Sequence, residues 1–158
     1  MKSPLQRSIV MALTVAFASC GGGASKSDDL ADRQEIQATL EAYLPLLAQA
    51  YSTGKLSPLE PYAAQKEVAS IHKRIEDLSL RGRTLEASLK SVTVEDVKIW
   101  NYSNAYVTTH EVWDLVVLAS GSDQILAEEY DQPNRVKYQL KRDDDTWRIL
   151  FREIQESS

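Results

Sequence analysis

The sequence predicts an α+β fold in which N-terminal helices pack on a curved, mainly antiparallel four-stranded sheet. The main observation is a change of period along the chain. Apolar residues recur every three or four positions in the first half and at alternate positions in the second half, as helices and strands require. Because the helices come first and the strands follow consecutively, neighbouring strands are expected to pair and the helices to cover one face of the sheet.

Length and composition are those of one soluble globular domain. The chain has 158 residues, of which 43% are hydrophobic and 26% charged, and this excludes a disordered chain or a polytopic membrane protein. The formal net charge of -5 argues against nucleic acid as a partner. One cysteine and two histidines make a zinc site implausible, and no catalytic or phosphate-binding motif is present. We therefore expect no metal, no cofactor and no enzymatic activity.

Residues 1–19 predict a lipoprotein signal peptide. Lys2 and Arg7 precede the apolar run IVMALTVAFA, which is about half the ~20 residues that span a bilayer. Small residues then lead to Cys20, the only cysteine, and a Gly/Ser-rich stretch over 21–27 follows as a tether. The alternative is an ordinary secreted protein in which Cys20 has no role.

The residues that end at Cys20, Phe-Ala-Ser-Cys, resemble the lipobox of bacterial lipoproteins, although Phe17 stands where an aliphatic residue is usual. The resemblance implies a diacylglyceryl thioether on Cys20, cleavage before it, and a further acyl chain, such as palmitate, on the freed amine. It places the protein in the cell envelope, anchored to a membrane through this lipid, and on the periplasmic face of the outer membrane in a Gram-negative cell. The folded domain is then expected over 28–158.

Two helices are expected at the start of the folded part. Asp28 or Asp29 caps the first helix, Gly54 ends it, and Pro45 either kinks it or ends it early. A short helical turn is expected next, over 59–64, and Gly82 closes the second helix. The apolar stripes are formed by Leu30, Ile36, Leu40, Leu44, Leu47 and Tyr51 in the first helix and by Val68, Ile71, Ile75 and Leu78 in the second.

Four strands are expected after Gly82. The alternation of the first strand slips between Val94 and Val97, which predicts a β-bulge. The second strand is expected to be the longest, and a loop over 119–134 is expected to follow it. The expected strands are 85–99, 105–118, 136–140 and 147–151, with turns at 101–104 and 143–145.

This element order resembles the NTF2-like (cystatin-like cone) superfamily and, within it, the IMS domain of ARC6-type division proteins. The resemblance covers about 31–154. It rests on the helix-rich first half, on Ala105-x-Val107-x-Thr109, and on Tyr138 with Trp147-Arg148-Ile149 near the end. These positions are structural. The resemblance implies a fold that often serves as a platform for protein interactions and that, in some members, holds a small ligand inside the cone.

Glu111 is the candidate functional residue of the sheet. Since alternate strand residues share a face, Glu111 joins an apolar set that includes Trp113 and points towards the helices. Buried there, it would act as a general base or a ligand anchor. A bend in the strand would instead take it to the rim, to be solvated or paired with an arginine. Trp113, Tyr138 and Trp147 either line a pocket with Glu111 or fill the core.

Two classes of function remain open. The first is a membrane-anchored, non-catalytic binding or interaction module, whose partner is an envelope protein or a second copy of the chain. A purely structural lipoprotein is a variant of this class that differs only in its partners. The second is a small-molecule binder or acid/base enzyme that uses Glu111 in a cone pocket. That class requires a further polar group that converges on Glu111.

Overall fold

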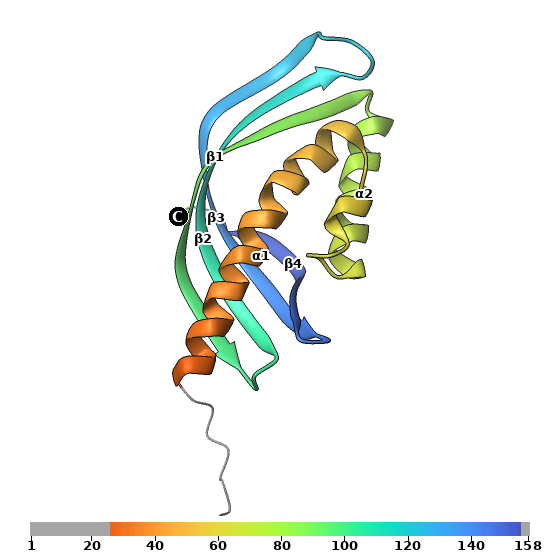
Figure 1. The fold of residues 1–158 in the computed structure, drawn as a ribbon. Coiled ribbons are helices and arrows are strands. Elements are labelled where there is room, and N and C mark those ends of the chain that lie inside the picture. The colour runs from red at the N-terminus through yellow and green to blue at the C-terminus, as the bar shows by residue number, and fades with distance from the viewer. Residues whose placement is uncertain (1–25, 156–158) are drawn as a thin grey trace, which may run out of the picture.

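The computed structural model describes residues 26–155, which form two layers (Figure 1). The helices α1 and α2 lie on the concave face of a single antiparallel sheet with the strand order β1-β2-β3-β4. The expected α+β fold with a four-stranded sheet is confirmed. The predicted signal peptide and the tether that begins at Cys20 lie outside the described residues. The elements are α1 (Lys26–Thr53), η1 (Ser57–Leu59), α2 (Gln65–Leu80), β1 (Arg83–Trp100), β2 (Asn104–Ala119), β3 (Ile125–Asp143) and β4 (Thr146–Gln155).

Helix α1 runs through Pro45 without ending there. The proline removes one backbone hydrogen bond, to the carbonyl of Glu41, but Leu44 and Leu47 beside it are fully buried and hold the helix on the sheet. Gly54 ends α1 as expected: its φ is +71° and its N–H donates to the carbonyl of Ala50 at 2.8 Å. The expected capping by Asp28 or Asp29 is wrong, because the helix already begins at Lys26.

The segment between the helices runs beside strand β4. The short helix η1 covers Ser57–Leu59, where Pro58 occupies a favourable first-turn position. The helical turn expected over 59–64 follows it, because the N–H groups of Tyr62 and Ala63 both donate to the carbonyl of Leu59 at 2.9 Å. Ile149 of β4 donates its N–H to Tyr62 and accepts a hydrogen bond from Ala64, at 2.9 and 2.8 Å. These bonds cover part of the outer edge of β4. Helix α2 then closes at Gly82, whose φ is +65°.

Strands β1 and β2 form a long hairpin whose register shifts twice, between Leu89 and Ser91 and between Val94 and Asp96. The second shift confirms the predicted bulge, and the first was not foreseen. Each shift adds a residue to one strand and increases the local bend. The sheet consequently arches over the C-terminal end of α1 and over α2 (Figure 1).

The loop expected over 119–134 is wrong, because β3 begins at Ile125 and pairs with the second half of β2. At 19 residues β3 is longer than β2, which has 16 and was expected to be the longest strand. The residues over 125–131 are exposed, so this part of the strand carries no apolar alternation. Pro133 lies beyond the last described β3–β4 pair, which joins Arg135 to Gln155.

The core lies between α1 and the concave face of the sheet. Its largest fully buried side chains are Trp147, Tyr43 and Tyr138, one from α1 and two from the sheet. Leu59 of η1 and Ile71 of α2 extend the core towards β4. Among the described residues, five polar or charged ones are buried with these apolar groups, and three of the five are carboxylates: Asp32, Glu67 and Glu111.

Candidate functional site

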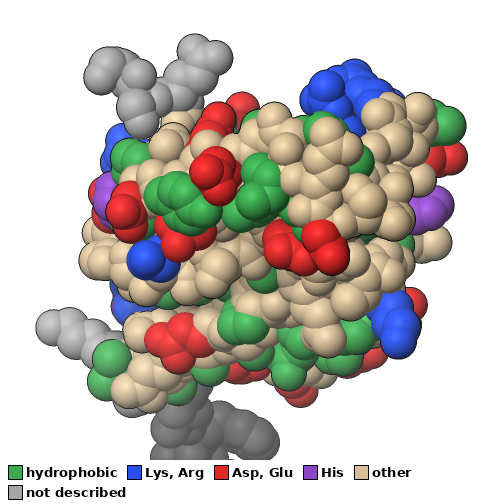
Figure 2. Space-filling model, turned by 90° about the horizontal axis from the view of Figure 1, so that it is seen from above, with side chains coloured by type: hydrophobic (Ala, Val, Ile, Leu, Met, Phe, Trp, Pro, Cys, Tyr) green, Lys and Arg blue, Asp and Glu red, His purple; other side chains and the backbone are tan. Residues whose placement is uncertain are grey.

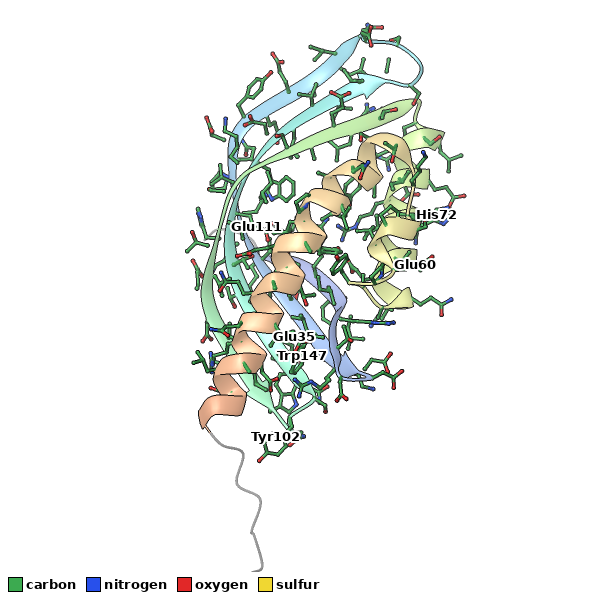
Figure 3. The ribbon with its side chains drawn as sticks, viewed as in Figure 1. Glu35, Glu60, His72, Tyr102, Glu111 and Trp147 are labelled. Carbon is green, nitrogen blue, oxygen red and sulfur yellow. The ribbon has the colours of Figure 1, made fainter. Side chains whose placement is uncertain are left out.

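Glu111 lies fully buried between β2 and α1 and is held by three hydrogen bonds (Figure 3). Its Oε1 accepts from the hydroxyls of Thr109 at 2.8 Å and Tyr138 at 2.6 Å, and its Oε2 accepts from the indole N–H of Trp113 at 2.9 Å. Burial of a carboxylate is costly unless its oxygens are hydrogen-bonded, and here neutral donors supply these bonds. In the described part of the chain, Glu111 therefore neither reaches the rim nor pairs with an arginine.

A second buried carboxylate, Glu67, projects from α2 into the same layer. Its Oε1 accepts from the hydroxyl of Tyr43 at 2.8 Å and lies 3.6 Å from Nε of Arg152. Burial raises the pKa of Glu67, while the hydrogen bond from Tyr43 and the charge of Arg152 lower it, and the net direction is upwards. Glu67 is therefore easier to protonate than an exposed glutamate.

The rings of Tyr43 and Tyr138 connect the two carboxylates. The rings meet edge to face, with their centroids 6.5 Å apart. Burial, and then the negative charges of Glu67 and Glu111 respectively, raise the pKa of both phenols well above the ordinary value. Both hydroxyls therefore stay protonated and act as fixed donors to the carboxylates.

A pocket of about 180 Å³ opens beside this buried polar group, between the C-terminal half of α1 and the arched part of the sheet. Both helices and all four strands contribute to its mainly apolar wall. Trp113 lies in this wall while its N–H is bonded to Glu111, and Glu111 itself is not part of the lining. The lining residues are Leu47, Ala48, Tyr51, Arg74, Leu85, Ala87, Trp113, Leu115, Asn134, Arg152 and Ile154.

Arg152 is the buried charged group of the pocket. Its side chain is only 9% exposed, and one terminal nitrogen donates to the hydroxyl of Tyr51 at 3.2 Å. Its Nε is buried and has no hydrogen-bond partner among the described residues. Burial lowers the pKa of Arg152, but the surrounding tyrosines and Glu67 raise it by more, so the guanidinium stays charged.

The four residues predicted to share a pocket do not all lie together. The structure brings together Glu111, Trp113 and Tyr138 through hydrogen bonds, and of the four only Trp113 lines the pocket. Trp147 is fully buried near the other end of α1, where the guanidinium of Arg142 lies 5.1 Å from its ring centroid. Figure 3 shows the separation of Trp147 from Glu111 along the sheet.

Arg152 was not predicted from the sequence, because the alternation of the strand predicts that its side chain lies on the outer face of the sheet. Continued alternation from Trp147 and Ile149 would put Phe151 inside and Arg152 outside. A register shift at this point of the β3–β4 pair adds one residue and reverses the faces. Arg152 then pairs with buried Tyr138 and shares its face. No residue type in the sequence marks this shift.

The described residues offer no metal site: within 26–155, no group of three or more His, Cys, Asp and Glu side chains is arranged to hold a metal ion. None of the helices in this range is long and apolar enough to cross a membrane. His72 and His110 are both exposed, and Figure 3 shows His72 on the outer side of α2, away from Glu111.

The fold and this pocket define a small α+β domain of the cone-shaped type, and the comparisons with known proteins place it in a family. The family model of the ARC6-like IMS domain matches residues 45–150, which is more than half of the chain. The chain therefore belongs to the ARC6-like IMS domain family, and the family resemblance drawn from the sequence is confirmed. Among curated proteins, none is similar enough to count as a match.

Solved structures share the fold at low sequence identity. The intermembrane space region of the chloroplast protein ARC6 superposes with a TM-score of 0.68 at 11% identity, over 78% of this chain and 96% of that chain. A variant of Rv3472 of Mycobacterium tuberculosis, described as of unknown function, gives 0.51 at 14% identity, over 86% and 78%. An NTF-2-like protein of unknown function from Shewanella oneidensis MR-1 gives 0.44 at 15% identity, over 79% and 99%. At these identities the likeness to the first two structures concerns the fold alone, and nothing is concluded from the third.

Proposed function

We propose that this protein is a membrane-anchored envelope protein whose domain is a non-catalytic binding module, with the pocket between α1 and the sheet as its binding site. The observation that carries the proposal is the pocket itself. It is concave and mainly apolar, and its wall includes a few polar side chains that can orient a bound molecule: Tyr51, Arg74, Asn134 and Arg152. The resemblance to a fold that often serves as an interaction platform supports the same function.

The state of the buried carboxylates favours binding over acid/base catalysis. A general base must come within hydrogen-bond reach of the substrate proton that it removes. Both oxygens of Glu111 already accept hydrogen bonds, and the residue is not part of the pocket wall. Glu67 is likewise engaged with Tyr43 and is not part of the wall. The acid/base function considered for Glu111 therefore has less support than binding.

Two separate observations support an envelope location. The lipobox resemblance at Cys20 supports an acyl anchor, and the similar ARC6 structure is an intermembrane space region of a chloroplast protein. With the domain held at a membrane, the bound molecule is a small ligand of the surrounding compartment, or a side chain presented by an envelope protein or a second copy of the chain.

The proposed binding site is tested by ¹⁹F NMR on the full chain in detergent, with fluorotryptophan at its three tryptophans. Toluene, cyclohexanol, benzamide and benzoate serve as probes. We expect at least one of them to shift the signal of Trp113, which lines the pocket, and to leave that of Trp100 in place, because Trp100 packs on Tyr106 outside it. The probe is expected to be recovered chemically unchanged.

The pocket-filling variant Ala87→Phe is expected to abolish the shift, since Ala87 lines the pocket. The matched control Ala127→Phe, at an exposed position of β3, is expected to keep it. A Trp113 signal that none of the four probes moves, or a probe that is converted to a product, would contradict the proposal.

A further inference from the structure

We infer that the pocket takes small organic monoanions, with the acid group on Arg152 and an apolar body against Trp113, Leu47 and Leu115. This inference rests on the proposed function and adds the chemical class of the ligand. Three observations support it: the charge of the pocket wall, the incomplete hydrogen bonding of Arg152, and the size of the space.

The wall of the pocket is positively charged although the protein is acidic. The formal net charge of the chain is -5, and acidic side chains are prominent among the hydrophobic ones on the face that Figure 2 shows. The pocket wall nevertheless contains two arginines, Arg74 and Arg152, and no aspartate or glutamate. A cleft with one sign of charge and low-dielectric walls concentrates ions of the opposite sign. An anion is therefore favoured over a neutral or cationic molecule of the same shape.

Arg152 lacks the partners that a buried guanidinium requires. Its five N–H groups form a planar fork that suits the two oxygens of a carboxylate. The described residues give it a hydrogen bond of 3.2 Å to Tyr51 and an ion pair of 3.6 Å with Glu67, which is longer than a hydrogen bond. The Oε1 of Glu67 already accepts from Tyr43, and Nε of Arg152 is left without a partner. A ligand carboxylate in the pocket would supply further acceptors for the terminal nitrogens of Arg152.

The pocket is too small for a drug-sized ligand. Its volume is about 180 Å³. Typical sites for larger ligands measure roughly 300–1,000 Å³. The space and its apolar wall therefore suit an acid with one ring or one short branched chain. A shallow groove that adjoins the pocket is lined by Arg74, Arg81 and Asp77 among others, so the charged groups at the mouth are two arginines and one aspartate.

The test compares benzoate with benzamide, a neutral molecule of nearly the same shape, by titration of the Trp113 ¹⁹F signal in the full chain. We expect benzoate to bind at least about tenfold more tightly, a difference of about 1.4 kcal/mol. Arg152→Gln is expected to remove this preference and to leave benzamide binding unchanged. Arg152→Lys keeps the charge without the planar fork, and it is expected to keep part of the preference.

Two further variants control the experiment. Arg135→Gln removes an exposed arginine outside the pocket, and it is expected to leave both affinities unchanged. Arg74→Gln, at an exposed position of the wall, is expected to weaken benzoate binding severalfold without unfolding the protein. It supplies the charge test if Arg152→Gln does not fold.

The outcomes separate this inference from the proposed function. Two outcomes overturn the anion preference but not the proposed binding function. One is equal affinity of the unaltered protein for benzoate and benzamide, and the other is a preference for benzoate that survives both Arg152→Gln and Arg74→Gln. A response of Trp113 to toluene or cyclohexanol but not to benzoate has the same meaning. If no probe moves Trp113, or if benzoate moves Trp100 equally, both proposals fail.

Discussion

Glu111 is buried in an apolar layer because its own strand and the next one supply its hydrogen-bond donors. Thr109 and Trp113 are two residues away on either side, so the strand period places them on the same face, and Tyr138 comes from β3. The sequence allowed the face of Glu111 to be predicted, since that requires only the alternation. It did not allow its partners to be predicted, because Tyr138 depends on the pairing register of two strands.

Substitution Glu111→Gln tests the energetic role of this arrangement. The amide group of glutamine cannot accept at both positions, so its NH₂ would face a donor and leave a buried hydrogen bond unmade. We expect the free energy of unfolding to fall by about 2–4 kcal/mol. Urea denaturation measures the change.

The control for this substitution is Glu129→Gln, at an exposed position of β3. It is expected to change the free energy of unfolding by no more than about 0.5 kcal/mol. If Glu111→Gln lowered the free energy of unfolding by less than about 1 kcal/mol, the hydrogen bonds from the three donors would stabilise the fold no more than hydrogen bonds to water stabilise the unfolded chain.

At the scale of elements, helix α1 contains a proline in its interior, where the burial of neighbouring apolar side chains outweighs the low helix propensity of proline. The periodicity predicted the helix and its end at Gly54, but not whether it would continue beyond Pro45. That outcome depends on the packing of Leu44 and Leu47 against the sheet, which is a tertiary effect.

Replacing Pro45 with alanine is expected to stabilise the protein. It restores the missing hydrogen bond to the carbonyl of Glu41 and removes the steric conflict of the ring, while the exposed side chain makes no core contact to lose. We expect the free energy of unfolding to rise by about 1–3 kcal/mol in urea denaturation. Pro58→Ala, in the first turn of η1, is the matched control and is expected to lower stability slightly. If both substitutions changed the free energy of unfolding in the same direction, Pro45 would not be a strained position.

For the molecule as a whole, the two layers and the order of elements could be predicted because they follow from the hydrophobic period. The pocket could not be predicted. Its wall depends on how strongly the sheet arches, and the arch follows from register shifts near Leu89 and Val94, of which only the second left a sign in the sequence. The position of Arg152 depends on a different register shift, between β3 and β4.

Membrane attachment is a property of the whole molecule and depends on one residue. We expect the full chain to sediment with membranes, to stay there in high salt and to incorporate labelled palmitate, because stable anchoring takes two or more acyl chains. Cys20→Ser is expected to abolish labelling and to release nearly all of the protein. Ser25→Ala, within the proposed tether, is the control and is expected to stay attached. Membrane attachment that persists in the Cys20→Ser protein would exclude the lipid anchor.

The length of α1 determines how far the binding site can stand from such an anchor. The helix begins at Lys26, and its contribution to the pocket begins at Leu47, 21 residues further along. At 1.5 Å per residue this distance is about 30 Å, as much as the hydrocarbon thickness of a bilayer. The residues of α1 that line the pocket lie over 47–51, near the end of the helix that Figure 1 shows remote from Lys26. With α1 perpendicular to the membrane, the pocket would lie in the aqueous phase beyond the lipid headgroups. Its occupancy would therefore follow the concentration of dissolved ligand and not the amount partitioned into lipid.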